Sequence, residues 1–67
     1  MKEIVIDPQI LGGTPVFRGT RVPVKALFDY LRGNDTLAEF LDDFPTVSEQ
    51  QAQAVLEAAE LSVEAAA

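Results

Sequence analysis

After Pro23, apolar residues recur at helical spacing in three consecutive segments of the chain. The spacing i, i+3, i+4, i+7 places four apolar side chains on one face of a helix. The three stripes consist of Val24, Leu27, Phe28 and Leu31; Leu37, Phe40, Leu41 and Phe44; and Ala52, Val55, Leu56 and Ala59. Because a helical stripe is stable only when it is covered, the pattern predicts three helices that pack into one small core.

A proline and a glycine-asparagine pair delimit the first of these helices. Pro23 has the fixed φ angle that suits a first helical turn, where its missing N–H is not needed. Gly33 and Asn34 favour the left-handed conformation that ends many helices. The first predicted helix therefore spans residues 23–33.

Hydroxyl residues begin the other two helices. Thr36 is followed three residues later by Glu39, and Ser48 is followed three residues later by Gln51, so each pair forms a capping box. The two helices are predicted over residues 36–44 and 48–60. Beyond them, residues 61–67 are expected to fray as an acidic tail.

The first 22 residues favour a short β-hairpin and a loop. Residues 3–6 are rich in β-branched side chains, and residues 16–18 form a second extended segment. Two such short strands are marginal on their own, so the hairpin must pack on the helices or on another chain. The predicted fold is therefore mainly α, with one domain over residues 1–67 in which a hairpin (1–22) precedes a three-helix bundle.

Only residues 45–47 connect the second and third predicted helices. A connection this short is typical of a helix-turn-helix. The third helix would then read DNA, with Gln50 and Gln53 directed outward, because glutamine can make two hydrogen bonds to adenine. This helix has no Lys or Arg, although phosphate contacts by such residues supply most of the affinity for DNA. A solvated polar face is therefore the favoured alternative, and DNA binding by the chain alone is expected to be weak.

The two halves of the chain carry charges of opposite sign. Residues 1–33 contain five bases and three acids, which gives +2, whereas residues 34–67 contain eight acids and no base, which gives −8. Such an asymmetry indicates two faces with different partners. The candidate DNA-binding or anion-binding bases are Arg18, Arg21, Lys25 and Arg32. The candidate acids for a basic protein partner are Glu57, Glu60 and Glu64.

The turn Arg18-Gly19-Thr20-Arg21 is the best candidate for an anion site. Two guanidinium groups beside one turn can form paired hydrogen bonds to phosphates or carboxylates. The alternative is that the arginines tie down the hairpin or pair with Asp7 and Asp29.

Two aromatic residues are candidates for contact with another protein. Phe17 and Val16 point to opposite faces of a strand, so one of them is expected to face away from the core, where a second chain would dock. Tyr30 falls off the main helical stripe, and an exposed tyrosine often marks an interface. The alternative is a surface tyrosine that packs along a neighbouring side chain. The chain is accordingly expected to form a homodimer.

The composition argues against catalysis. The chain has no Cys, and it has no His, which is the commonest general base and metal ligand. Without a histidine, its two serines and one tyrosine form no recognisable pair of nucleophile and base. We expect no catalytic residue, no metal site, no cofactor and no enzymatic activity. The absence of a long apolar run and of a secretory signal predicts a cytoplasmic protein that does not enter a membrane.

The order of the short motifs in this chain resembles a small prokaryotic family known as domain of unknown function 433. The resemblance covers roughly residues 4–60 and rests on Ile6-Asp7-Pro8, Gly12-Gly13-Thr14-Pro15-Val16, Arg18-Gly19-Thr20-Arg21-Val22-Pro23-Val24, Gly33-Asn34 and Phe44-Pro45-Thr46-Val47-Ser48. It implies a VapB-like antitoxin with a homeodomain-like trihelical fold. Such an antitoxin would neutralise a PIN-like ribonuclease toxin and would help to repress the shared operon.

Two other functions remain open at this point. The first alternative is a helix-turn-helix transcriptional regulator that acts alone on DNA. The second is a dimerisation module that binds neither a toxin nor DNA.

Overall fold

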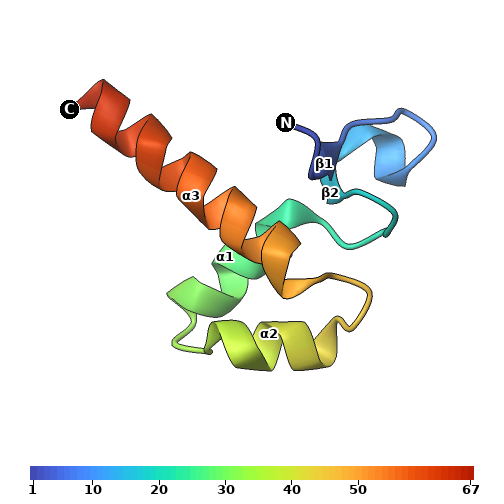
Figure 1. The fold of residues 1–67 in the computed structure, drawn as a ribbon. Helices are drawn as coiled ribbons and strands as arrows, with labels where there is room; N and C mark the ends of the chain where they lie inside the picture. The colour runs from blue at the N-terminus through green and yellow to red at the C-terminus, as the bar shows by residue number, and fades with distance from the viewer.

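The computed structural model describes residues 1–67 as three α-helices preceded by a two-stranded antiparallel hairpin. The elements are β1 (Ile4–Val5), the short turn η1 (Leu11–Gly13), β2 (Val16–Phe17), α1 (Val24–Arg32), α2 (Leu37–Asp43) and α3 (Glu49–Ala66). In Figure 1 the hairpin lies at one end of the molecule, and the C-terminal turns of α3 extend toward the other end. The prediction of a mainly α fold with an N-terminal hairpin is confirmed.

The ends of α1 depend on Pro23 and Asn34. Pro23 is the residue before the helix, with an extended backbone, and it also forms an isolated antiparallel bridge with Val16. The left-handed residue at the other end is Asn34, with φ 70°, whereas Gly33 has φ −88°. The Asp35 amide then donates to the Tyr30 carbonyl at 2.9 Å, which closes the end of the helix. The predicted left-handed cap is present, and it is Asn34, not Gly33, that adopts the left-handed conformation.

Both predicted capping boxes are confirmed. The hydroxyl of Thr36 accepts from the Glu39 amide at 3.1 Å, and the hydroxyl of Ser48 accepts from the Gln51 amide at 3.0 Å. In each box the N3 side chain also accepts from the backbone N–H of the capping residue. These bonds satisfy helix N–H groups that would otherwise lack a partner, so they define where α2 and α3 begin.

The expectation that residues 61–67 fray is wrong, because α3 continues to Ala66. Once a helix is nucleated, adding a residue costs little, and this segment is rich in alanine, the best helix former. Residues 60–67 are nevertheless all exposed. We call residues 57–66 of α3 the C-terminal arm, because most of this segment extends beyond the core.

The core lies where the hairpin meets the three helices. Its six buried residues are Phe17, Leu27, Phe40, Val47, Ala52 and Val55. At least one comes from each of the three predicted stripes, and Phe17 comes from β2. The stripes therefore predict most of the core, and the hairpin completes it.

The prediction that Phe17 faces a second chain is wrong, because its side chain is fully buried and its ring lies 6.0 Å from that of Phe40. The alternation within β2 is still present: Phe17 pairs with Ile4, which packs on the core, whereas Val16 pairs with Val5. Val16 is also fully buried, and it lines a pocket with Val5 and Ile10. Both faces of β2 are therefore covered, one by the helices and the other by the preceding loop.

Candidate functional site

The turn Arg18-Gly19-Thr20-Arg21 is held by its own hydrogen bonds. The Thr20 hydroxyl donates to the Phe17 carbonyl at 2.8 Å and accepts from the Val22 amide at 3.0 Å. Gly19 has φ 78°, a conformation that glycine adopts without steric cost. These bonds fix the two arginine backbones on either side of the turn.

Arg18 has a structural role in the hairpin. Its Nε donates to the Lys2 carbonyl, and its amide donates to the Glu3 carbonyl at 2.9 Å. The Arg18 carbonyl accepts from the side-chain amide of Gln51 at 2.9 Å, which ties the hairpin to the first turn of α3. The contacts of Arg18 thus agree with the interpretation in which the arginines of this turn tie down the hairpin. Its exposed guanidinium still leaves donors at the surface.

The other bases are dispersed. Lys25 forms an ion pair with Asp29 at 2.8 Å on the exposed side of α1. Asp29 therefore pairs with this lysine and not, as one interpretation of the turn expected, with Arg18 or Arg21. Such an exposed pair contributes little to stability. Arg21 and Arg32 are exposed and form no ion pair.

The predicted DNA-binding residues fall on three separate elements. Arg18 and Arg21 lie on the turn after β2, Lys25 and Arg32 lie on α1, and Gln50 and Gln53 lie on α3. Leu27 of α1 and Val55 of α3 belong to the same core cluster, so the exposed faces of these helices point away from each other. The structure does not gather these residues into one basic reading surface.

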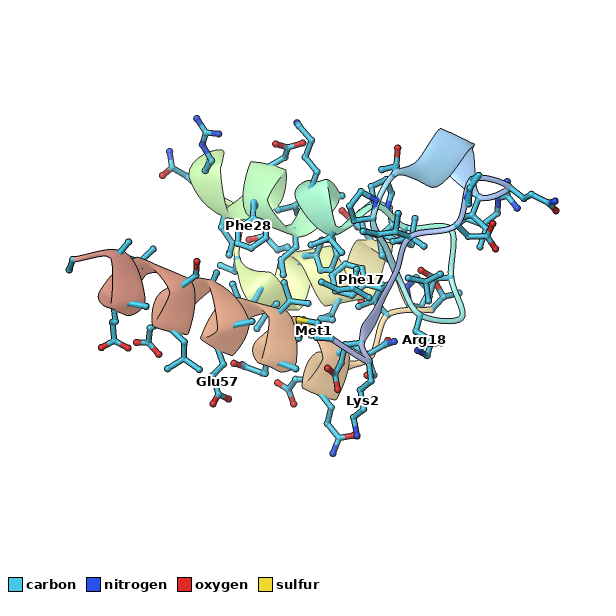
Figure 2. All side chains as sticks on the ribbon, turned by 90° about the horizontal axis from the view of Figure 1, so that it is seen from above. Met1, Lys2, Phe17, Arg18, Phe28 and Glu57 are labelled. Carbon is cyan, nitrogen blue, oxygen red and sulfur yellow. The ribbon has the colours of Figure 1, made fainter.

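The acidic residues of α3 do form one surface. Gln53, Glu57, Glu60 and Glu64 follow one another at spacings of four, three and four residues, so they share one side of the helix. Figure 2 shows Glu57 directed away from the body of the molecule. A shallow groove of about 490 Å³ follows this side of α3 and is lined by Gln53, Leu56, Glu57, Glu60 and Leu61. The arm therefore offers carboxylates and an apolar strip next to each other.

Tyr30 is half-buried and not a free surface tyrosine. Its ring packs edge-on against Phe40 and Phe44, with centroids 5.4 and 5.7 Å apart. Its hydroxyl donates to Asp43 Oδ2 at 2.6 Å, which links α1 to the end of α2. This hydrogen bond, together with partial desolvation and the negative charge of Asp43, raises the pKa of Tyr30 to about 12.

We expect the tyrosinate absorbance of the folded chain to titrate near pH 12, above the ordinary tyrosine pKa of 10.0. The chain has no Trp and only this Tyr, so the signal belongs to one group. Because folding raises this pKa, its contribution to stability is complete below pH 10 and is lost as the pH rises toward 12. Asp43→Asn should move the midpoint down toward 10, with circular dichroism as the control for folding. A midpoint near 10 in the unmodified folded chain would show that Asp43 does not hold the hydroxyl.

A second pocket was not predicted from the sequence. It has a volume of about 360 Å³ and is lined by Val5, Ile10, Val16, Gly19, Thr20, Arg21 and Thr46. Its residues come from the hairpin, the loop before β2 and the turn before α3, so no periodic pattern connects them. An apolar lining beside a free guanidinium suits an apolar group that carries or adjoins a negative charge.

The comparisons with known proteins identify a family. No helix combines the length and the apolar character needed to cross a membrane. No curated protein and no solved structure gives a significant match to the chain. A family model described as "Protein of unknown function (DUF433)" matches residues 4–58, which include the hairpin, α1, α2 and the first part of α3. The chain therefore belongs to the DUF433 family.

Proposed function

We propose that this chain is the antitoxin of a type II toxin–antitoxin module and acts by binding a PIN-like ribonuclease in the cytoplasm. In this proposal the chain has no catalytic activity of its own. Its role is to present a recognition surface to the toxin and thereby to block access to the toxin's active site.

The observation that carries the proposal is the C-terminal arm. It is helical to Ala66, it is largely uncovered, and it contains Glu57, Glu60 and Glu64 without any base. A nuclease surface that binds RNA must attract phosphates, so it is expected to be basic. An acidic helix complements such a surface and speeds the association of the two proteins.

A preformed helix makes this role more favourable than a frayed tail would. A segment that orders only on binding loses conformational entropy at that step, which lowers its affinity. Because α3 already extends through the arm, this loss is small, and the acidic side chains keep a fixed spacing.

DNA binding has a smaller part in the proposal. The candidate bases lie on separate elements, and α3 carries Glu49 and Glu57 on its exposed surface, where DNA phosphates would repel them. We therefore favour the antitoxin over a regulator that acts alone, and we assign any repression of the operon to the complex with the toxin.

The test is to express the tagged chain together with its flanking genes and to identify what co-purifies, with and without nuclease treatment. The proposal predicts a stoichiometric small ribonuclease-like protein that is retained after nuclease treatment. Recovery of DNA alone, lost on nuclease treatment, would contradict the antitoxin proposal and would favour the regulator. Recovery of neither would contradict both.

A further inference from the structure

The large exposed apolar side chains of this protein fall into two groups at opposite ends of the chain. Met1, Ile6 and Leu11 lie in the N-terminal segment, and Leu61 and Val63 lie in the C-terminal arm, with exposed fractions between 45% and 70%. Single exposed apolar residues are common in folded proteins. In the segment that contains the first group, the exposed charged side chains are basic, whereas in the arm they are all acidic.

The N-terminal segment also carries a basic surface. We call Lys2, Arg18, Arg21 and the pocket beside Arg21 the hairpin surface. These three bases are exposed, whereas the two acids of the same segment, Glu3 and Asp7, are half-buried. The Asp7 carboxylate is also engaged, because its Oδ1 accepts from the Gln9 amide at 2.9 Å. The hairpin surface therefore combines an apolar pocket of about 360 Å³ with free cationic groups.

The C-terminal group borders an acidic surface. In the arm, Leu61 lies four residues after Glu57 and three residues before Glu64, so it shares a side of the helix with both. No residue after Arg32 is basic, so nothing within the arm neutralises these carboxylates. The arm therefore carries an apolar side chain between acids, which matches the pocket and its arginine on the hairpin surface.

One base of the hairpin surface and one acid of the arm lie on the same side of the molecule. Figure 2 shows Lys2 and Glu57 on the side opposite α1. Figure 1 shows the hairpin and the C-terminal end of α3 at different ends of the fold. A two-fold axis on this side of the molecule, perpendicular to the line between the two ends, places the arm of each copy opposite the hairpin surface of the other and closes the assembly at two chains.

We propose that the chain forms a two-fold dimer in which the arm of each copy lies on the hairpin surface of the other. Leu61 enters the pocket, and the arm carboxylates pair with Arg18 and Arg21 of the second copy. Pairing of two arms along their acidic sides would instead place glutamates against glutamates, which is repulsive. This interface forms without a ribonuclease, so the dimer can be tested independently of the proposed function.

Two charge-reversed variants test this dimer by sedimentation of the chain alone. The arm variant is Glu60→Lys with Glu64→Lys, and the hairpin variant is Lys2→Glu with Arg21→Glu. Each places like charges at both contacts of its own dimer, so each should weaken self-association by at least about tenfold. In an equimolar mixture every contact joins opposite charges again, so a heterodimer should form about as tightly as the unmodified dimer.

A matched control changes the net charge by the same amount as the arm variant, but at residues outside α3. Asp35→Lys with Asp42→Lys alters two exposed acids outside α3 and should leave self-association unchanged. An unmodified chain that stays monomeric at millimolar concentration would overturn the proposal. A hairpin variant that dimerises like the unmodified chain would also overturn it, and so would a mixture that does not associate. Circular dichroism of each variant establishes that these outcomes come from folded protein.

Discussion

Replacing Phe40 by alanine is expected to remove a large share of the free energy of unfolding of this protein. The Phe40 side chain is fully buried, and its ring lies 5.1–6.0 Å from those of Phe44, Tyr30 and Phe17. Removing a buried phenylalanine costs about 3–5 kcal/mol. A chain of this length has a total stability of roughly 3–10 kcal/mol, so the loss takes away a large share of it.

Thermal unfolding followed by circular dichroism measures this effect. The midpoint of Phe40→Ala should fall by at least about 12 °C. The control is Ile6→Ala, because Ile6 is 68% exposed and its loss should change the free energy of unfolding by no more than about 0.5 kcal/mol. Equal midpoints for the two variants would contradict the core described above.

Reversing two charges in the arm is expected to abolish tight binding to the ribonuclease. Glu60→Lys with Glu64→Lys places cations where the proposed interface needs anions, and both residues are exposed, so the fold is unaffected. Like charges that face each other across an interface cost several kcal/mol, and about 1.4 kcal/mol already corresponds to a tenfold loss of affinity. The dissociation constant, measured by calorimetric titration, should rise at least about a hundredfold.

Two further variants define the source of that loss. Asp35→Lys with Asp42→Lys changes the net charge by the same amount outside α3 and should leave the affinity within about threefold of the original. A chain that ends at residue 59 should bind as weakly as the arm variant. If the Asp35 and Asp42 variant lost affinity equally, net charge and not the arm would determine binding.

The helices of this protein were predictable because their signals are local. Each capping box joins residues three apart in the sequence, so Thr36 and Ser48 indicate where α2 and α3 begin without any knowledge of the fold. The stripe of each helix likewise needs only its own spacing, and Leu27, Phe40 and Val55 are buried as that spacing predicts.

The contacts that the sequence does not predict join residues that are distant in the chain. Phe17 is buried and not at a partner surface, because the loop before β2 covers the opposite face of the strand, which strand alternation does not reveal. The hydroxyl partner of Tyr30, Asp43, lies 13 residues away on another helix. Arg18 bonds to the Lys2 carbonyl, 16 residues before it. Local patterns contain no information on such pairs.

The candidate site was predictable in part for the same reason. The acidic side of the third helix follows from helical spacing, and the structure leaves Glu57, Glu60 and Glu64 exposed as expected. The pocket beside Arg21 depends on three segments that meet only in the folded chain, so it had no signal in the sequence. Under the two proposals made above, the arm has two uses that exclude each other: a second copy would occupy it in the free protein, and the ribonuclease would occupy it in the complex.

The most direct test of the central claim is RNA cleavage by the purified neighbouring ribonuclease in the presence of this chain. We expect that an equimolar amount of the unmodified chain stops cleavage and that the Asp35 and Asp42 variant does the same. The Glu60 and Glu64 variant, folded by circular dichroism, should leave cleavage at the rate of the free enzyme. Full inhibition by that variant would contradict the claim that the C-terminal arm is the binding element.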